Sequence, residues 1–322
     1  MQRAEGTVER RDGTRRGLRT AVLIPCFNEA AAIAQVIGDF RAAIPEAAIY
    51  VYDNNSTDQT VQVAEQCGAE VGREPRQGKG NVVRRMFRDI DADIYVLVDG
   101  DATYDAASAR GLIAKLIDGH HDMVVGARVS QGEAAYRRGH RFGNRMLTGF
   151  VTRIFGTDLR DMLSGYRVFS RRFVKSFPIL SRGFEIETEL TIHALGLELP
   201  IIEVDTPYYA RPAGSASKLN KWRDGVRIMA TILQLYRSER PLPFFAIVGA
   251  WLAAISVVLA IPIFITYLKI GLVPRIPTAI LATGLMILAF LSISVGFVLD
   301  TVTRGRREMK LLAYLAQPPF GS

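Results

Sequence analysis

Two long stretches without a charged residue constrain this chain more than any other feature. They cover residues 243–268 and 276–299. Each is long enough to cross a hydrocarbon core of roughly 30 Å as a helix that rises about 1.5 Å per residue. Gly271 and Pro274 lie between them and favour a turn. The pattern predicts a transmembrane hairpin over 242–301; a pair of buried core helices is the less favoured alternative.

Basic residues flank this hairpin unequally. Only Lys269 and Arg275 lie in the turn, whereas more arginines and lysines sit just outside its two outer ends. By the positive-inside rule, the domain before the hairpin and the tail 302–322 are expected in the cytoplasm. Residues 1–19 form a polar, basic tail without the apolar core of a signal peptide, which agrees with that orientation.

The chain has 322 residues, enough for one sizeable domain before the hairpin. Short apolar strands alternate with amphipathic helices along its first half, which predicts an α/β fold. We expect a Rossmann-like, mostly parallel sheet with helices on both faces, within a domain over 20–220. The expected strands are 20–25, 48–52, 70–72, 94–98, 122–126 and one near 200–204. The expected helices lie near 28–43, 59–68, 78–88 and 106–117.

Residues 221–241 carry apolar side chains at helical spacing and lie directly before the first apolar stretch. We expect an amphipathic helix in the membrane interface, with a helix packed on the domain as the alternative. The net charge of +8 suits an anionic partner. No nucleic-acid recognition motif is present, so nucleic acid is excluded as the partner. Cys26 and Cys67 have no metal-ligand spacing and are expected to be reduced structural thiols.

Asp99-Gly100-Asp101 follows the expected strand 94–98. Two carboxylates at a strand end form a compact oxygen site that suits Mg²⁺ or Mn²⁺, with substrate phosphates completing the coordination. The alternative is a solvated turn that caps the next helix.

Two further motifs lie at predicted loop positions. Asp53 opens a polar run, 53–58, where it and Asn55 can contact a base or ribose; an Asx-rich turn is the alternative. Lys79 lies in a Gln-Gly-Lys-Gly segment that lacks the spacing of a phosphate-binding P-loop. It is a candidate phosphate contact, and a plain turn before a helix is equally acceptable.

A set of cations recurs between the carboxylate site and the hairpin. Arginine is suited to bidentate phosphate contacts, although each one taken alone is better explained as a surface charge. The loop 211–218 contains small residues and could close over a pyrophosphate. The set consists of Arg128, Arg137, Arg138, Arg141, Arg167, Arg211 and Lys218.

Together these motifs resemble family 2 glycosyltransferases of the GT-A fold, and most closely the polyprenyl-phosphate glycosyltransferases related to dolichol-phosphate mannose synthase. The resemblance covers about residues 20–220, and the hairpin resembles that of bacterial membrane-bound members. The matching segments are Ile24-Pro25-Cys26-Phe27-Asn28-Glu29, Asp53-Asn54-Asn55-Ser56-Thr57-Asp58, Asp99-Gly100-Asp101, Asp161-Met162-Leu163-Ser164-Gly165-Tyr166-Arg167 and the loop 211–218.

The resemblance implies a role for each matching position. Asp99, Gly100 and Asp101 would hold the metal and the donor diphosphate. Arg211 and Lys218 would clamp the phosphates. The residues around the nucleotide base and ribose would be Pro25, Phe27, Glu29 and Asp53. The residues for the lipid phosphate would be Arg128 with Arg138 or Arg141. One departure is the segment D-N-N-S at Asp53, where many members have D-D-G-S.

The implied reaction is a single inverting displacement in which a lipid phosphate oxygen attacks the anomeric carbon of a nucleotide-sugar. The product would serve modification of cell-envelope glycans. From bacterial relatives we expect a UDP-sugar rather than a GDP-sugar, polyprenyl (undecaprenyl) phosphate as acceptor, and location in the bacterial inner membrane with multiple passes. The oligomeric state is open, although a two-helix anchor leaves faces free for a homo-oligomer.

Two other hypotheses are kept. A transferase with a soluble or protein acceptor would need a general base, for which Glu185, Glu187 or Glu189 could serve. A membrane-tethered nucleotide-sugar sensor would have a silent site, and the pair Asp99 and Asp101 argues against it.

Overall fold

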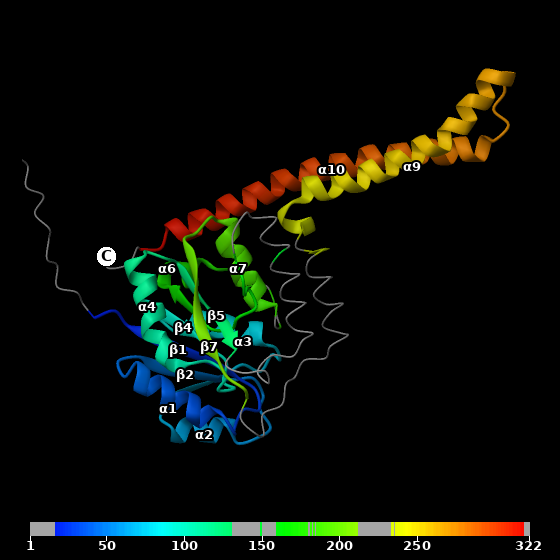
Figure 1. The fold of residues 1–322 in the computed structure, drawn as a ribbon. Coiled ribbons are helices and arrows are strands. Elements are labelled where there is room, and N and C mark those ends of the chain that lie inside the picture. Colours follow the sequence, from blue (N-terminus) through cyan, green and yellow to red (C-terminus); the bar gives the residue numbers. More distant parts are fainter. Residues whose placement is uncertain are drawn as a thin grey trace, which may run out of the picture.

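The computed structural model describes residues 17–130, 149, 159–179, 181, 183, 185–211, 233–234 and 236–318. A seven-stranded sheet forms the centre of the domain, in the order β3-β2-β1-β4-β6-β5-β7 (Figure 1). The strands are β1 (Thr20–Cys26), β2 (Ala48–Asp53), β3 (Glu70–Arg73), β4 (Ile94–Leu97), β5 (Met123–Ser130), β6 (Arg167–Ser170) and β7 (Ile201–Tyr208). The helices among the described residues include α1 (Ile33–Ala43), α2 (Thr60–Gln66), α3 (Lys79–Asp89), α4 (Ala109–Asp118), α6 (Arg171–Ser176), α7 (Ile186–Gly196), α9 (Pro241–Ile270) and α10 (Ile276–Leu315).

The sheet is mixed but mostly parallel. β1 pairs in parallel with β2 and β4, β2 with β3, and β5 with β7. β6 runs antiparallel between β4 and β5 and has no counterpart among the predicted strands. β1, β4 and β6 are buried along almost their whole length, as expected for strands covered on both faces. The predicted α/β class and mostly parallel sheet are confirmed.

Alternate residues of each strand point to opposite faces, so two hydrophobic cores form. One core joins Leu23, Tyr95 and Phe169 to side chains of α3, α6 and α7. The other joins Ile24 and Val96 to side chains of α1 and α4. Figure 1 shows these helices on the two sides of the sheet, as predicted.

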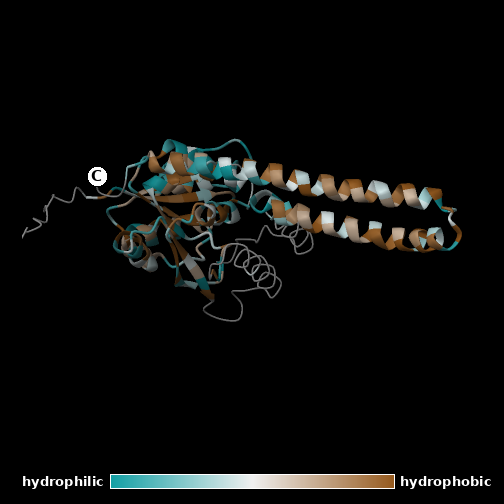
Figure 2. Cartoon of the chain, turned by 90° about the horizontal axis from the view of Figure 1, so that it is seen from above, coloured by the Kyte–Doolittle hydropathy of each residue, from teal (hydrophilic) through white to brown (hydrophobic). Residues whose placement is uncertain are grey.

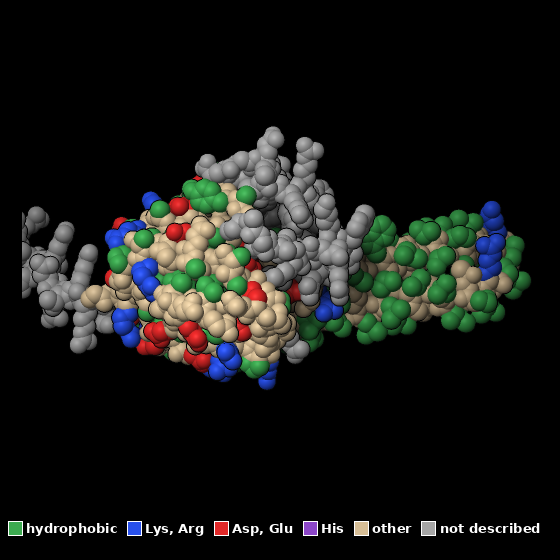
Figure 3. All heavy atoms as spheres, turned by 90° about the horizontal axis from the view of Figure 1, so that it is seen from below, with side chains coloured by type: hydrophobic (Ala, Val, Ile, Leu, Met, Phe, Trp, Pro, Cys, Tyr) green, Lys and Arg blue, Asp and Glu red, His purple; other side chains and the backbone are tan. Residues whose placement is uncertain are grey.

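α9 and α10 project from the domain as an antiparallel pair (Figure 1). Each is long and apolar enough to cross a membrane, and only 11% and 17% of their most apolar windows are buried. A core helix of a soluble protein would be mostly buried, so these two helices are not of that kind. Figure 2 shows their predominantly hydrophobic composition, and Figure 3 shows hydrophobic side chains on the projecting part with basic ones at its far end.

Small residues at heptad spacing form the seam between the two helices. In α10 the buried residues are Ala282, Ala289, Gly296 and Thr303. A Cβ on Gly296 would lie 3.1 Å from Phe245 Cβ, which shows how closely the backbones approach. Small residues permit such contact between apolar helices, where packing rather than water exclusion favours association.

The structure differs from the predicted hairpin at one end. α10 continues without a break to Leu315, well past the predicted end of its apolar stretch at 299. The predicted N-terminal tail lies almost wholly outside the described residues. Most of the predicted interfacial helix at 221–241 also lies outside them.

Candidate active site

The loops after β1, β2 and β4 lie at one edge of the sheet. β1 pairs in parallel with both other strands, and Cys26 lies in register with Asp53. The carboxyl ends of parallel strands therefore bring residues 27–29, 53–58 and 99–101 to the same edge, where ligands of such sheets bind. A hydrogen bond of 2.9 Å from the Asn54 backbone N–H to the Cys26 carbonyl joins the first two loops.

The side chains predicted to surround the nucleotide base lie at the end of β1 and in these loops. Pro25 and Phe27 are half-buried, and Glu29 is buried, with its backbone N–H donating to Thr60 Oγ1 at 2.9 Å. A Cβ on Gly100 would lie 2.7 Å from Cys26 Sγ, so the third loop passes the end of β1 without room for a side chain.

Asp53 is buried and shapes its own loop. Its carboxylate accepts backbone hydrogen bonds from Asn55 at 3.1 Å and Ser56 at 3.2 Å. Asn28, at φ 53°, donates from its backbone to Ser56 Oγ at 2.8 Å and accepts from the Thr57 N–H at 2.8 Å. The Asx turn is therefore present, and a nucleotide contact by Asp53 remains a prediction.

Asn54, which was not among the predicted site residues, holds the Gln-Gly-Lys-Gly segment in place. Its Nδ2 donates to the carbonyls of Glu74 and Arg76, both at 2.8 Å, and its Oδ1 accepts from the Gly78 N–H at 2.7 Å. An ionised aspartate could not donate the first two bonds. The asparagine at position 54 of the D-N-N-S segment thus has a structural reason. Its amide side chain was the feature of the sequence that could have indicated this role.

Lys79 lies between two carboxylates. Its Nζ is 2.5 Å from Asp99 Oδ1 and also contacts the Glu187 carboxylate. The Lys79 and Glu187 side chains are 9% and 7% exposed. Burial alone would lower the pKa of Lys79, but Asp99 and then Glu187 outweigh it and raise that pKa above its usual value. The structure therefore places the predicted phosphate contact in a buried ion-pair network that joins α3, α7 and the loop after β4.

Asp101 has partners on both carboxylate oxygens. Oδ1 accepts from Thr103 Oγ1 at 2.6 Å, and Oδ2 is 2.7 Å from an Arg211 guanidinium nitrogen. Burial raises the pKa of Asp101, the neighbouring charge of Asp99 raises it further, and Arg211 opposes both effects. Arg211 thus reaches the carboxylate site, as the predicted phosphate clamp would need to.

The electrostatics of the carboxylate pair, Asp99 and Asp101, fit a divalent metal. The charge of Asp99 raises the pKa of Asp101, and a cation between them would relieve that repulsion. The described residues contain no group of three or more His, Cys, Asp or Glu side chains that could hold a metal. One or two protein carboxylates with substrate phosphates is the arrangement that Mg²⁺ commonly uses.

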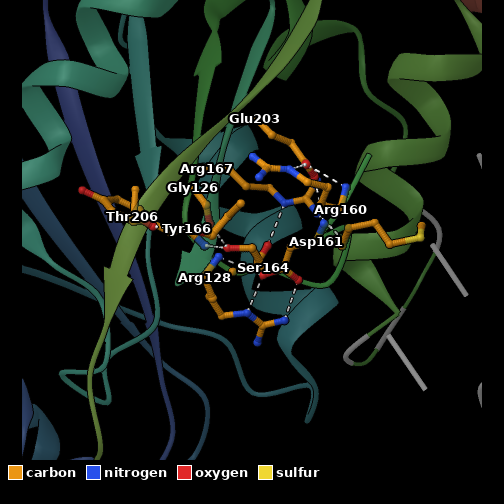
Figure 4. Close-up of polar contacts among 12 residues, drawn as sticks. Gly126, Arg128, Arg160, Asp161, Ser164, Tyr166, Arg167, Glu203 and Thr206 are labelled. Atoms are coloured by element: carbon orange, nitrogen blue, oxygen red, sulfur yellow. Dashed lines mark hydrogen bonds and ion pairs between the residues drawn. The ribbon is translucent and has the colours of Figure 1, made fainter. Parts of the chain in front are cut away.

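Arg128, the predicted contact for the acceptor phosphate, forms a bidentate pair with Asp161 (Figure 4). Its Nε and one terminal nitrogen each lie 2.7 Å from an Asp161 oxygen, and the Arg128 backbone N–H donates to the same carboxylate at 3.1 Å. The guanidinium also lies 5.6 Å from the centre of the Tyr208 ring. Asp161 was named only as part of a motif, and the structure assigns it to orienting Arg128.

Arg167 is fully buried and closes the loop that begins at Asp161 (Figure 4). It donates to the carbonyls of Ser164 at 2.9 Å and Met162 at 2.5 Å, and to Thr191 Oγ1 at 2.9 Å. Burial lowers its pKa to about 10. Arg167 therefore has a structural role. Its residue type had made it a candidate for a phosphate contact instead.

The same loop brings Gly165 against the carboxylate site. A Cβ on Gly165 would lie 2.5 Å from Asp99 Oδ2, and the Gly165 N–H donates to Tyr104 Oη at 2.9 Å. Gly165 thus packs directly against the Asp99 carboxylate, where a larger residue would not fit. Of the remaining predicted residues, Arg137, Arg138, Arg141 and Lys218 lie outside the described part of the chain.

Comparison with known proteins identifies the family. Residues 21–177 match the domain "Glycosyl transferase family 2". Glycosyltransferase AglJ of Haloferax volcanii is 36% identical over 248 residues, which cover 76% of this chain and 80% of that protein. The dolichyl-phosphate hexose transferase of the same organism is 27% identical over 220 residues, covering 68% of this chain and 95% of that protein.

A solved structure shares the fold. Glucosyl-3-phosphoglycerate synthase from Mycobacterium tuberculosis, in complex with Mn²⁺, UDP-glucose and phosphoglyceric acid, superposes with a TM-score of 0.55 at 25% identity, covering 68% of this chain and 79% of that chain. The chain therefore belongs to glycosyl transferase family 2: it is a glycosyltransferase of the GT-A fold that uses a nucleotide-sugar donor.

Proposed function

We propose that this enzyme transfers a sugar from a UDP-sugar to a polyprenyl phosphate, with inversion, at the cytoplasmic face of the bacterial inner membrane. Support comes from one juxtaposition: the chain that carries the phosphate-directed site also carries α9 and α10, whose apolar surfaces are mostly exposed. Such an anchor keeps a catalytic domain near lipid headgroups, which is useful when one substrate is itself a lipid. The relative named dolichyl-phosphate hexose transferase supports the same class of acceptor.

On the donor side, Asp99 and Asp101 would hold Mg²⁺ or Mn²⁺, which would neutralise negative charge on the diphosphate when bound. Arg211, 2.7 Å from Asp101, can add a bidentate contact to the same diphosphate. Asp53 and Glu29 would face the ribose and base. The solved neighbour with Mn²⁺ and UDP-glucose supports this donor class.

On the acceptor side, a phosphate oxygen would form a bond to the anomeric carbon while the bond from that carbon to the diphosphate oxygen breaks. The electron pair of the broken bond leaves with the nucleoside diphosphate, and no proton needs to move, because the acceptor phosphate is already ionised. Catalysis then rests on positioning and charge stabilisation. Arg128, oriented by Asp161, would bind the acceptor phosphate.

The structure bears on Glu187, one of the three glutamates considered as a general base for a hydroxyl acceptor. A hydroxyl nucleophile needs a general base, and the Glu187 carboxylate is instead held in an ion pair with Lys79. The proposed reaction has no use for such a base.

The test is transfer of label from radioactive UDP- and GDP-sugars to undecaprenyl phosphate in lipid vesicles that contain the purified enzyme. We expect label in the organic phase with a UDP-sugar, loss of it with EDTA, and loss of it in Asp101→Asn. Transfer to a soluble phosphoglycerate instead of the lipid would replace the proposed acceptor. Donor hydrolysis with no transfer to any prenyl phosphate would also contradict the proposal.

A further inference from the structure

The cytoplasmic end of α10 docks on the catalytic domain, far from the active site. Figure 1 shows this end running above α7 and α6. Tyr314 faces the domain, whereas Thr303 and Arg307, nearer the hairpin, contact the segment that leads into α9. On the opposite face of the same turns, Met309 and Leu312 are 71% and 66% exposed, so the contact is one-sided.

The outer contact is centred on Tyr314. Its hydroxyl donates to Asp122 Oδ2 at 2.7 Å, and Asp122 is buried and also accepts from Ser170 Oγ at 2.6 Å. Arg172 donates to the Gln317 carbonyl at 2.9 Å and lies 4.8 Å from the centre of the Tyr314 ring. Tyr314 also packs against the hydrophobic core beneath α6 and α7. A charged acceptor, a cation over the ring and apolar packing therefore converge on one side chain.

A second contact lies nearer the hairpin. Arg307 donates to the Glu239 carbonyl at 3.1 Å and lies 3.4 Å from the Glu239 carboxylate, while Thr303 Oγ1 donates to the Ser238 carbonyl at 3.3 Å. Ser238 and Glu239 directly precede α9. The contacts at Thr303 and Tyr314 are about 16 Å apart along the helix, at about 1.5 Å per residue.

The domain is therefore joined to the hairpin at two places: through the chain that leads into α9, which α10 holds at Ser238 and Glu239, and through the contact at Tyr314. A domain joined to a helix at one point can pivot about it, whereas contacts at two separated points on one unbroken helix oppose rotation. Asp122 directly precedes β5, and Arg128 lies within that strand, about 20 Å away at about 3.3 Å per residue. The contact at Tyr314 is thus mechanically connected to the proposed acceptor residue without touching the site.

We propose that the cytoplasmic end of α10, together with the residues after it up to Gln317, is a brace that sets the orientation of the active site toward the bilayer. Tyr314 and Arg172 are then positioning residues for an acceptor embedded in the membrane. This inference rests on the proposed lipid acceptor. It adds the prediction that the brace affects transfer to an acceptor held in the bilayer and not to a soluble one.

The test compares Tyr314→Ala and Arg172→Ala with Leu312→Ala, which alters the exposed face of the same helix. Each variant is assayed with undecaprenyl phosphate in vesicles and with a short-chain, water-soluble prenyl phosphate. The brace predicts that kcat/KM for the vesicle-bound acceptor falls about tenfold or more in the first two variants, the size expected for loss of a hydrogen bond to a charged group. The short-chain acceptor and the Leu312 variant should stay within about twofold of the wild type.

Equal losses with both acceptors would indicate a merely structural role and overturn the inference, as would no loss with either. Tyr314→Phe, which keeps the ring and removes only the hydroxyl, provides the same comparison if Tyr314→Ala does not fold. A wild-type enzyme that labels no prenyl phosphate at all would contradict the proposed function itself, which separates the two failures.

Discussion

At the scale of single residues, the site depends on how Asp99 is held. Lys79 neutralises it from α3, Glu187 on α7 binds the same lysine, and Gly165 leaves room for the carboxylate. The three contributions come from distant parts of the chain. They explain why the carboxylate that a metal would use has so little freedom to move.

Lys79→Met should destabilise the protein by about 3–5 kcal/mol, because it leaves the buried Glu187 carboxylate and Asp99 without their shared cation. Glu187→Gln should cost less, since Lys79 keeps Asp99 as a partner. Thermal unfolding in detergent measures both. The pH profile of kcat should be unchanged in Glu187→Gln; a profile that loses a titrating group would restore Glu187 as a general base.

Gly165→Ala should lower kcat about a hundredfold, since the new Cβ would displace the Asp99 carboxylate by an amount comparable to a 1 Å misplacement. Gly111→Ala on α4 is the matched control, because a Cβ there meets nothing within 4 Å. Steady-state kinetics at saturating donor would distinguish them. Equal activity of the two variants would mean that the position of Asp99 is not critical.

The carboxylate pair of the candidate site could be predicted from the sequence, whereas the contacts that position it have no local sequence signal. Asp99 and Asp101 stand out because carboxylates after a buried strand are recognisable. The partnership of Lys79 with Glu187 spans 108 positions, and no spacing rule connects them. Arg167 was misleading because an arginine is normally exposed, and only the tertiary structure shows three carbonyl and hydroxyl acceptors around it.

At the scale of elements, regular alternation predicted β1 to β5 and the helices between them. β6 was missed because it begins with an arginine, a residue type that is normally exposed and so does not indicate a buried strand. α7 also lacked a usable pattern: nearly all of its residues are buried, so it has no polar face to mark a period. Elements that are buried all round are the ones for which periodicity fails.

α7 contains a buried imidazole that should make stability depend on pH. His193 packs against Phe173 and Phe177, and neither ring nitrogen has a hydrogen-bond partner. Burial, together with the nearby charge of Lys310, lowers its pKa from 6.5 to about 3. Below pH 6.5 the unfolded state binds the proton first, so stability is lost as pH falls from 6.5 toward 3.

The loss from this group reaches roughly 4 kcal/mol at pH 3, at about 1.4 kcal/mol per pKa unit. His193→Leu should therefore reduce the acid sensitivity of thermal unfolding between pH 4 and 6.5. Exposed His120 provides the control, as His120→Gln should leave the pH dependence unchanged. Identical pH profiles of the wild type and His193→Leu would contradict this explanation.

At the scale of the whole molecule, hydropathy predicted the two apolar helices, but not how far α10 continues. The residues after 299 are charged and polar, and such a composition is as compatible with a solvated tail as with a helix. The docking face becomes recognisable only once Asp122 and Arg172 lie beside Tyr314, far away in sequence.

The seam of the hairpin gives a prediction at this scale. A Cβ on Gly249 would lie 2.9 Å from the Ala289 carbonyl oxygen, a backbone atom that cannot easily move, whereas a Cβ on Gly284 meets nothing within 4 Å. Gly249→Ala should therefore destabilise the packed pair by about 1–3 kcal/mol, and Gly284→Ala should be close to neutral. Unfolding in detergent, followed by circular dichroism, measures the difference; equal stability would mean that the helices do not pack along this seam.

With the proposed lipid acceptor, a catalytic domain anchored by α9 and α10 would search for its substrate in two dimensions. The quantity that sets its rate is then the mole fraction of acceptor in the surrounding leaflet, not its amount per volume of solution. Adding inert phospholipid to the vesicles should slow the enzyme, while diluting the same vesicles with buffer should not. For such an enzyme, the composition of the membrane acts as the concentration of the substrate.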